Sequence, residues 1–310
     1  LGLLEVKPAD YRTTNGNYVT VSNTDKKEAL LDSVNKLECV SFVIPGSTTM
    51  SITLPLDDYL QTSYVEEILS VSLVQNEVLE PEQLIEGEMP SGAHEVVLDK
   101  AVIDTFLRGG LGNAVGLNTA QKFIGRRLTV SNLDDYIIVG ISDTESPSLF
   151  VDKSQVMYLL SNGNASEEEY YMMEDYDDDV VKSGKVMDID LAKSDIKIKK
   201  GKKPDSKFEA IISDAYEEEI AIGKTLSTKV GGHKLKVVGY YTSSNIDEDT
   251  YYVHADTIKA HYISKQKEFT AYAEDTSLLK STLDKEGLSA KVNDTRDRKT
   301  YINSRKNQLT

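Results

Sequence analysis

The tripeptide Gly223-Lys224-Thr225 has the residue types that close a phosphate-binding loop. The motif of that loop, G-x-x-x-x-G-K-[ST], also needs an earlier glycine, where the backbone folds around the phosphates. The matching position is Glu218, which lies between two further glutamates whose charges would repel a phosphate. We therefore expect no nucleotide site at this tripeptide.

Two acid-rich segments carry carboxylates that could coordinate a divalent cation. The first contains Asp175, Asp177, Asp178 and Asp179, and the second contains Asp247, Glu248 and Asp249. Neither follows the spacing of the EF-hand calcium loop, in which a glycine and a closing glutamate occupy fixed positions. We expect solvated acidic loops here and leave weak divalent binding open.

The remaining reactive side chains form no recognisable catalytic motif. The histidines are His94, His233, His254 and His261, and they make neither an H-E-x-x-H helix nor part of a G-x-S-x-G elbow. Cys39 is the only cysteine, so it cannot form an internal disulfide, and its apolar neighbours favour a small buried hydrophobe. We expect no catalytic residue, no metal and no cofactor. An enzyme would need a site assembled from residues far apart in the sequence.

The charge of the chain excludes one class of partner. The chain has 310 residues, with 35 Lys and Arg against 51 Asp and Glu, which gives a net charge of −16. Nucleic-acid binding depends on basic contacts that release counterions, so we expect no nucleic-acid partner. The same charge would attract a cationic ligand, although acidity is also a common means of staying soluble.

An aromatic and methionine cluster in an acidic segment is our candidate contact surface. It consists of Tyr170, Tyr171, Met172, Met173 and Tyr176. Apolar side chains that are exposed and rimmed by charge mark sites of interaction with a partner.

Two stretches of the chain share landmarks in the same order. The first contains Glu95–Asp99, Ile124-Gly125, Val139-Gly140 and Leu149–Asp152; the second contains Glu209–Ser213, Ile222-Gly223, Val238-Gly239 and Tyr251–His254. Gly125 and Gly140 are 15 positions apart (140 − 125), and Gly223 and Gly239 are 16 apart (239 − 223). We infer a duplicated strand-helix-strand unit over residues 91–160 and 205–258.

A charged segment, residues 161–204, joins the two repeats. It is acid-rich at its start and lysine-rich at its end, where Lys197, Lys199, Lys200, Lys202 and Lys203 lie. Blocks of charge without periodic apolar residues are typical of exposed segments, so we predict a linker or an extended hairpin.

The two ends of the chain have similar element patterns. Strands are predicted at 17–22 and 38–44 around a helix at 26–37, and strands at 268–273 and 289–292 around a helix at 277–286. Thr276 or Ser277 is the predicted cap of the last helix. We expect the two ends to pack together, and we predict an α+β fold.

Four segments in the first half of the chain form an ordered set of motifs: Leu84–Pro90, Glu95–Asp99, Ile124–Leu128 and Tyr136–Ile141. They resemble the "Leu-x-x-Gly-Arg-x-Pro", "Glu-x-x-Ile-Ser", "Gly-x-x-Ile" and "Tyr-x-Val-Val-Gly-Ile" passages of the ectodomains of MacB/FtsX-type ABC transporter permeases. The chain departs from the pattern at Glu88, where arginine is usual. It also has a long stretch before Ile124 where the family has a short "Gly-Leu-x-x-Gly-Asp" connection, to which Val115-Gly116-Leu117 is only weakly similar.

The resemblance implies a mixed β-α-β porter-like region made by residues 1–90 and 262–310. A β-rich region, residues 91–261, is then inserted into it and holds both repeats. Such ectodomains lie between two membrane helices, on the extracytoplasmic face of the cell membrane. The single cysteine suits a Gram-positive surface protein as well as a cytosolic one, and the resemblance favours the Gram-positive surface. The chain starts without Met and has no stretch of about 18 apolar residues, so we expect the spans to flank it.

The resemblance also implies a function without catalysis. The domain would couple ATP hydrolysis, by a separate or fused cytoplasmic ATP-binding partner, to export or extraction of an antimicrobial peptide or a drug. A dimer of permeases and an adaptor protein are further implied partners. The stalk toward the membrane would include Tyr11, Arg298, Lys299, Arg305 and Lys306. The alternative is an extracellular module that senses or binds a cationic peptide or a partner protein.

Overall fold

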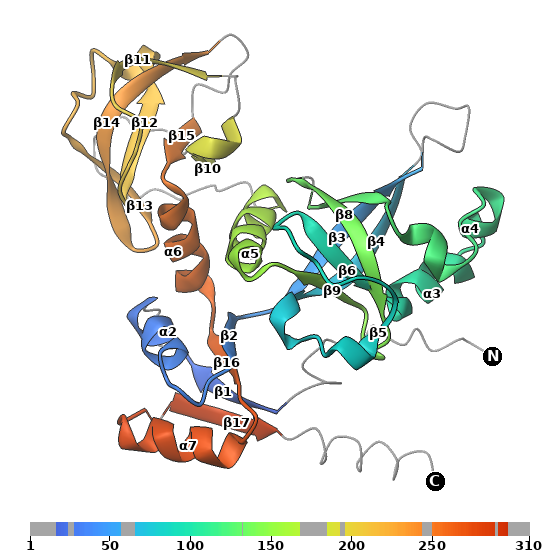
Figure 1. The fold of residues 1–310 in the computed structure, drawn as a ribbon. Helices are drawn as coiled ribbons and strands as arrows, with labels where there is room; N and C mark the ends of the chain where they lie inside the picture. The colour runs from blue at the N-terminus through green and yellow to red at the C-terminus, as the bar shows by residue number, and fades with distance from the viewer. Residues whose placement is uncertain are drawn as a thin grey trace, which may run out of the picture. The chain divides into compact units, whose positions relative to one another are not determined.

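The computed structural model of the chain describes residues 17–23, 28–56, 66–131, 133–167, 185–192, 196–243, 250–288 and 291–296. Helices and sheets both contribute, so the fold is α+β (Figure 1). The described residues form two compact units. Unit 1 comprises those within Leu1–Asp25, Ala29–Leu160 and Lys267–Thr310, and unit 2 comprises those within Lys26–Glu28 and Ser161–Gln266.

Unit 1 contains a four-stranded sheet made from both ends of the chain. Its strand order is β17-β1-β16-β2. The bounds are β1 Tyr18–Ser22, β2 Phe42–Pro45, β16 Glu268–Tyr272 and β17 Val292–Arg296, with helices α2 (Glu28–Asn35) and α7 (Thr276–Lys285) between them in the chain. Because β1 pairs with both β16 and β17, the predicted association of the two ends is confirmed.

A second sheet of unit 1 has seven strands and closes on itself. The bounds are β3 Thr49–Pro55, β4 Glu66–Gln75, β5 Leu84–Gly87, β6 Glu95–Asp99, β7 Arg127–Val130, β8 Asp135–Ser142 and β9 Ser148–Val151. The order is β5-β8-β6-β9-β4-β3-β7, and β7 also pairs with β8. A ring therefore runs through β8, β6, β9, β4, β3 and β7. β9 is buried along its whole length and β6 everywhere but its first residue, which explains their nearly continuous apolar sequences.

The helices of unit 1 follow local signals. α3 (Lys100–Arg108) begins after Asp99, whose carboxylate accepts from the Ala101 N–H, and buries Val102, Ile103 and Phe106. The shorter elements are η1 Asn76–Val78, η2 Pro81–Gln83, α4 Leu111–Ala114 and η3 Ala120–Phe123. α5 (Lys153–Glu167) begins in unit 1 and ends in unit 2.

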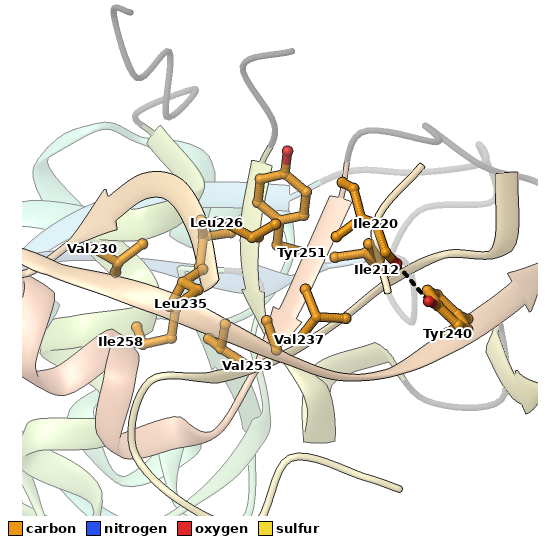
Figure 2. Close-up of a cluster of buried hydrophobic side chains, with 12 residues drawn as sticks. Ile212, Ile220, Leu226, Val230, Leu235, Val237, Tyr240, Tyr251, Val253 and Ile258 are labelled. Atoms are coloured by element: carbon orange, nitrogen blue, oxygen red, sulfur yellow. Dashed lines mark hydrogen bonds between the residues drawn. The ribbon is translucent and has the colours of Figure 1, made fainter. Parts of the chain in front are cut away.

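Unit 2 is a six-stranded sheet with one main helix. The bounds are β10 Lys185–Asp188, η4 Ile189–Ala192, β11 Ile196–Gly201, β12 Glu209–Ser213, η5 Asp214–Tyr216, β13 Thr225–Val230, β14 His233–Ser243, β15 Thr250–Val253 and α6 Ala255–Lys265. The order is β10-β15-β12-β14-β11, and β13 pairs with β14. Figure 2 shows its core, in which Leu226, Leu235 and Ile258 meet and the Tyr240 hydroxyl donates to the Ile220 carbonyl.

The two units share a pattern of strand pairing. In unit 1, β6 is parallel to β8 and antiparallel to β9, and β4 is parallel to β9. In unit 2, β12 is parallel to β14 and antiparallel to β15, and β10 is parallel to β15. One edge of β8 pairs first with β7 and then with β5, and the same edge of β14 pairs first with β13 and then with β11.

Facing glycines lie where each long strand changes its partner. Gly87 is opposite Gly140 in unit 1, and Gly201 is opposite Gly239 in unit 2. A Cβ on Gly87 would lie 2.2 Å from the Val139 carbonyl oxygen, and one on Gly201 would lie 2.3 Å from that of Val238. No side chain fits such a gap, so these glycines permit the close crossing.

Several sequence predictions differ from the structure in instructive ways. The strand expected at 38–44 begins only at Phe42, because turn residues precede it. Asp275, not Thr276 or Ser277, caps α7, and its carboxylate accepts from two backbone N–H groups. In the second repeat, the expected helix is only the short 3-10 turn η5.

The division of the chain also differs from the expected one. Residues 91–160 lie in unit 1 with the outer segments, and unit 2 contains only the second of the two expected repeats. Within the expected linker, 161–204, strands β10 and β11 join the sheet of unit 2. The period-two alternation of Ile196 and Ile198 with lysines is the strand signal that the charge obscured.

The described helices are also too short or too polar to cross a lipid bilayer.

Replacing Gly87 with alanine should destabilise unit 1 much more than replacing Gly125. Both glycines have positive φ angles, +78° and +80°, but a Cβ on Gly125 meets nothing within 4 Å. Gly125→Ala should cost only the left-handed backbone penalty of about 1–2 kcal/mol. Gly87→Ala adds a clash with backbone and should cost roughly 3 kcal/mol or more in urea unfolding. Equal losses would mean that the strands do not cross as closely as described.

Candidate functional site

The sequence-predicted contact and stalk residues all lie outside the described residues. The contact cluster is Tyr170, Tyr171, Met172, Met173 and Tyr176, and the stalk residues are Tyr11, Arg298, Lys299, Arg305 and Lys306. They remain predictions. The described strands that lead toward the stalk segments are β1 and β17, and Tyr18 is opposite Arg296 across their ladder.

Four lysines on β11 or directly after it pair with neighbouring carboxylates. The Lys199 ammonium lies 3.1 Å from Asp214 and 3.2 Å from Glu217, and Lys200 lies 2.9 Å from Glu217. Lys202 bridges Asp205 and Glu209, and Lys203 pairs with Asp190. These pairs hold the pKa of Glu217 below its ordinary value, chiefly through the hydrogen bonds from Lys200 and Lys199. These four lysines therefore offer little free positive charge, and as exposed pairs on an edge strand they add little stability.

The most constrained polar group of unit 1 is the carboxylate of Asp99, at the end of β6. The side chain is fully buried. Its Oδ1 accepts from the Ala101 N–H at 2.9 Å. Its Oδ2 accepts from the Ser142 hydroxyl at 3.0 Å, and from the Thr144 N–H and hydroxyl at 2.8 Å each. Asp99 therefore joins the start of α3 to the end of β8 and the loop after it.

Burial and hydrogen bonding act on Asp99 in opposite directions. Removal from water raises the pKa of Asp99 above the ordinary aspartate value, and this is the largest effect. The hydrogen bonds from Ala101, Thr144 and Ser142 lower it and offset part of the shift. A fully buried carboxylate that accepts hydrogen bonds from Ala101, Ser142 and Thr144 is not accessible to a substrate, so the arrangement is a structural connector.

An aromatic cluster joins the two sheets of unit 1. Phe42 stacks on Tyr272 with ring centroids 4.3 Å apart, and Tyr18 lies 5.7 Å from Tyr272. These rings belong to the same buried cluster as Val74, Val97 and Phe150 of the seven-stranded sheet. A movement of β1 or β16 therefore meets a packed interior that transmits strain.

The histidines and the cysteine are dispersed among structural roles. His94 stacks on Tyr136, His233 stacks on Phe208, His254 caps α6, and His261 accepts from the Gly231 N–H. Cys39 is partly exposed, so the prediction of a buried residue is wrong, because the turn before β2 holds it near the surface. Among the described residues, no three His, Cys, Asp or Glu side chains are placed to hold a metal ion.

One local signal in the sequence indicates the Asp99 connector, and none indicates its partners. An aspartate that ends a buried strand and starts a helix is a recognisable cap. Ser142 and Thr144 follow in the chain by 43 and 45 positions and look like ordinary polar residues. Only the parallel pairing of β6 with β8 brings them to the carboxylate.

Replacing Asp99 with asparagine should destabilise the chain although it removes a buried charge. The amide nitrogen would face donors from Ser142 or Thr144, leaving buried groups unpaired at a cost of about 2 kcal/mol or more. The measurement is chemical unfolding. Asp104→Asn on the same helix, at the half-exposed partner of Lys100, is the control and should leave stability nearly unchanged. An equally small effect of Asp99→Asn would contradict the connector role.

The pKa of Asp99 should be raised and that of Asp152 lowered. Asp152 accepts from the hydroxyl and the N–H of Ser154, which lowers its pKa. A carboxyl-carbon NMR titration should place the two midpoints on opposite sides of the ordinary value of about 3.9. Since the folded chain holds the Asp99 proton more tightly, its contribution to stability is greatest at acid pH. That contribution is lost as the pH rises through the raised pKa. Midpoints in the reverse order would refute both assignments.

Comparison with known proteins gives structural likenesses only. No family model matches the chain, and no curated protein matches it significantly. The chain is similar to the solved periplasmic region of MacB from Actinobacillus actinomycetemcomitans, with 16% identity, a TM-score of 0.28 and coverage of 50% of this chain and 72% of that one. It is also similar to the solved extracellular domain of the noncanonic ABC-type transporter YknZ from Gram-positive bacteria, with 11% identity, a TM-score of 0.26 and coverage of 49% and 72%. The chain thus has similar structures among extracytoplasmic domains of ABC-type transporters, each over about half of its length.

Proposed function

We propose that the chain is the non-catalytic extracytoplasmic domain of an ABC-type transporter permease of the MacB/FtsX type. The observation that carries this proposal is the meeting of the motif segments around β8. Leu84–Pro90 contains β5, Glu95–Asp99 is β6, and Tyr136–Ile141 lies within β8, which pairs with both. The Gly125 N–H of the fourth segment donates to the Ile138 carbonyl at 2.7 Å. Segments far apart in sequence thus act as one structural motif.

The duplicated unit and the porter-like arrangement belong to the same proposal. Equivalent bonds support the duplication: the Gly223 N–H donates to the Val237 carbonyl at 2.8 Å, as Gly125 does to Ile138. The facing glycines Gly87 and Gly201 lie at matching places. The β-α-β character of the four-stranded sheet, with β1 between β16 and β17, supports a porter-like region built from the two ends.

The position of the chain ends suits a domain between two membrane spans. Tyr18 and Arg296 are opposite each other across the β1–β17 ladder, so the segments before β1 and after β17 leave the sheet at neighbouring points. A stalk made of two adjacent segments can move as one body. We propose that ATP hydrolysis by a cytoplasmic partner moves this stalk, and that the four-stranded sheet passes the movement to the seven-stranded sheet through Tyr272 and Phe42.

Reading the parent gene on both sides of this chain is the direct test. We expect an apolar run of about 20 residues before residue 1 and another after residue 310. Further membrane spans after the second run would give additional support to the transporter proposal. A signal peptide before the chain with a stop codon or a wall anchor after it would refute the transporter proposal.

The net charge of −16 favours a second candidate, a module that binds a cationic peptide. Calorimetric titration with a series of peptides of rising positive charge should then show binding that weakens as salt is added, because exposed charges are screened. Absence of heat at low salt would eliminate this candidate and leave the transporter proposal unaffected.

A further inference from the structure

Three lysines on the hairpin of β13 and β14 form no ion pair with another described residue, unlike Lys199 and Lys200 of β11. We call Lys229, Lys234 and Lys236 the hairpin lysines. All three are exposed. In a chain with a net charge of −16, such a group of lysines is a local exception.

The sheet geometry gathers these lysines on one face. Lys229 is directly opposite Lys234, and Thr225 is opposite Lys236. The alternate residues Leu226, Val230 and Leu235 are buried in the core of unit 2 (Figure 2), so the lysines face away from it. Like charges directly opposite each other destabilise a ladder, and a bound anionic partner would relieve the repulsion.

The equivalent hairpin of unit 1 carries an ion pair. There Arg127 is opposite Ile137, as Thr225 is opposite Lys236 in unit 2. The Arg127 guanidinium lies 3.0 Å from the Asp135 carboxylate, which neutralises it. Among the described residues, the hairpin of unit 1 thus carries an ion pair, whereas the hairpin lysines of unit 2 form none.

The outer edge of β13 is a second difference between the units. In unit 1, β7 pairs with β8 on one side and with β3 on the other, where Thr53 is opposite Thr129. In unit 2, β13 pairs with β14, and no other described strand extends the sheet beyond it. Such an edge presents backbone N–H and C=O groups to a further strand.

We propose that this surface binds an extended, acid-rich peptide segment of a partner protein, which adds a strand to β13. Main-chain hydrogen bonds would supply the pairing, and glutamate or aspartate side chains would lie against the hairpin lysines. The described exposed side chains of β13 are Thr225, Ser227 and Lys229, so charge and backbone, rather than an apolar anchor, define the ligand. A lipid bilayer has no backbone groups to pair with the edge. The inference rests on unit 2 alone and does not depend on the transporter proposal.

The test uses the 310-residue chain and a fluorescent synthetic peptide of about eight residues that alternates Glu and Thr, the length of an ordinary strand. Fluorescence anisotropy should show binding that weakens with salt. The double variant Lys234→Glu, Lys236→Glu should bind about tenfold more weakly or worse, a loss within the range for close charge pairs at interfaces. The control is Lys280→Glu, Lys285→Glu, which makes the same charge change on exposed residues of α7 and should bind as the parent does.

A second peptide separates strand addition from simple attraction. The same sequence, N-methylated at alternate residues, keeps its charge but loses the donors that face β13, and it should bind much more weakly. Equal binding of both peptides would overturn strand addition, and equal binding to both double variants would overturn the site. Anionic phospholipid vesicles are the last probe: if they bind through Lys234 and Lys236 while the peptide does not, the partner is a membrane and the proposal is wrong. Circular dichroism of each variant confirms that it is folded.

Discussion

The close crossing of backbone at facing glycines is the constraint on which both units depend. Gly87 meets Gly140, and Gly201 meets Gly239, where each long strand passes from one partner to the next. The register shifts next to this point in the parallel ladders of β6 with β8 and of β12 with β14. A bulge bends a strand and re-aims its side chains, which lets one strand serve two neighbours on a single edge. Without a gap free of side chains, β5 and β11 could not lie there.

The two units share this pattern of strand pairing and differ in the strands and helices that are added to it. Unit 1 gains β3, which completes a ring of strands, and α3, which is tied to β8 through the carboxylate of Asp99. Unit 2 replaces the helix by a short turn and covers its core with α6. In the two proposals above, the closed ring of unit 1 transmits movement, and the β13 edge of unit 2, to which no second described strand is paired, contacts a partner.

Local patterns in the sequence predicted most of the individual elements. The landmarks of the repeat and the strands and helices at the two ends of the chain are all visible without coordinates. What could not be predicted depends on distant pairing. Strand β11 was predicted as part of a linker because its lysines are typical of a solvated segment. Their carboxylate partners, Asp214 and Glu217, are brought beside Lys199 and Lys200 only by the fold. No sequence signal predicts the hairpin lysines, since each is ordinary alone and they differ from the β11 lysines only in forming no ion pair with another described residue.

The ladder between β1 and β16 has a consequence for how the chain is made. Tyr18 is opposite Tyr272, so the ladder spans 254 positions (272 − 18), and all the described residues of 161–266 lie inside this loop. The entropic cost of closing a loop rises with the length of the loop. During synthesis, the ribosome also releases β1 long before β16. Val19 and Val21 of β1 are fully buried in the folded chain, and β1 pairs with β16 and β17. The four-stranded sheet therefore cannot be completed until synthesis has passed Val292–Arg296, and until then β1 lacks both partner strands.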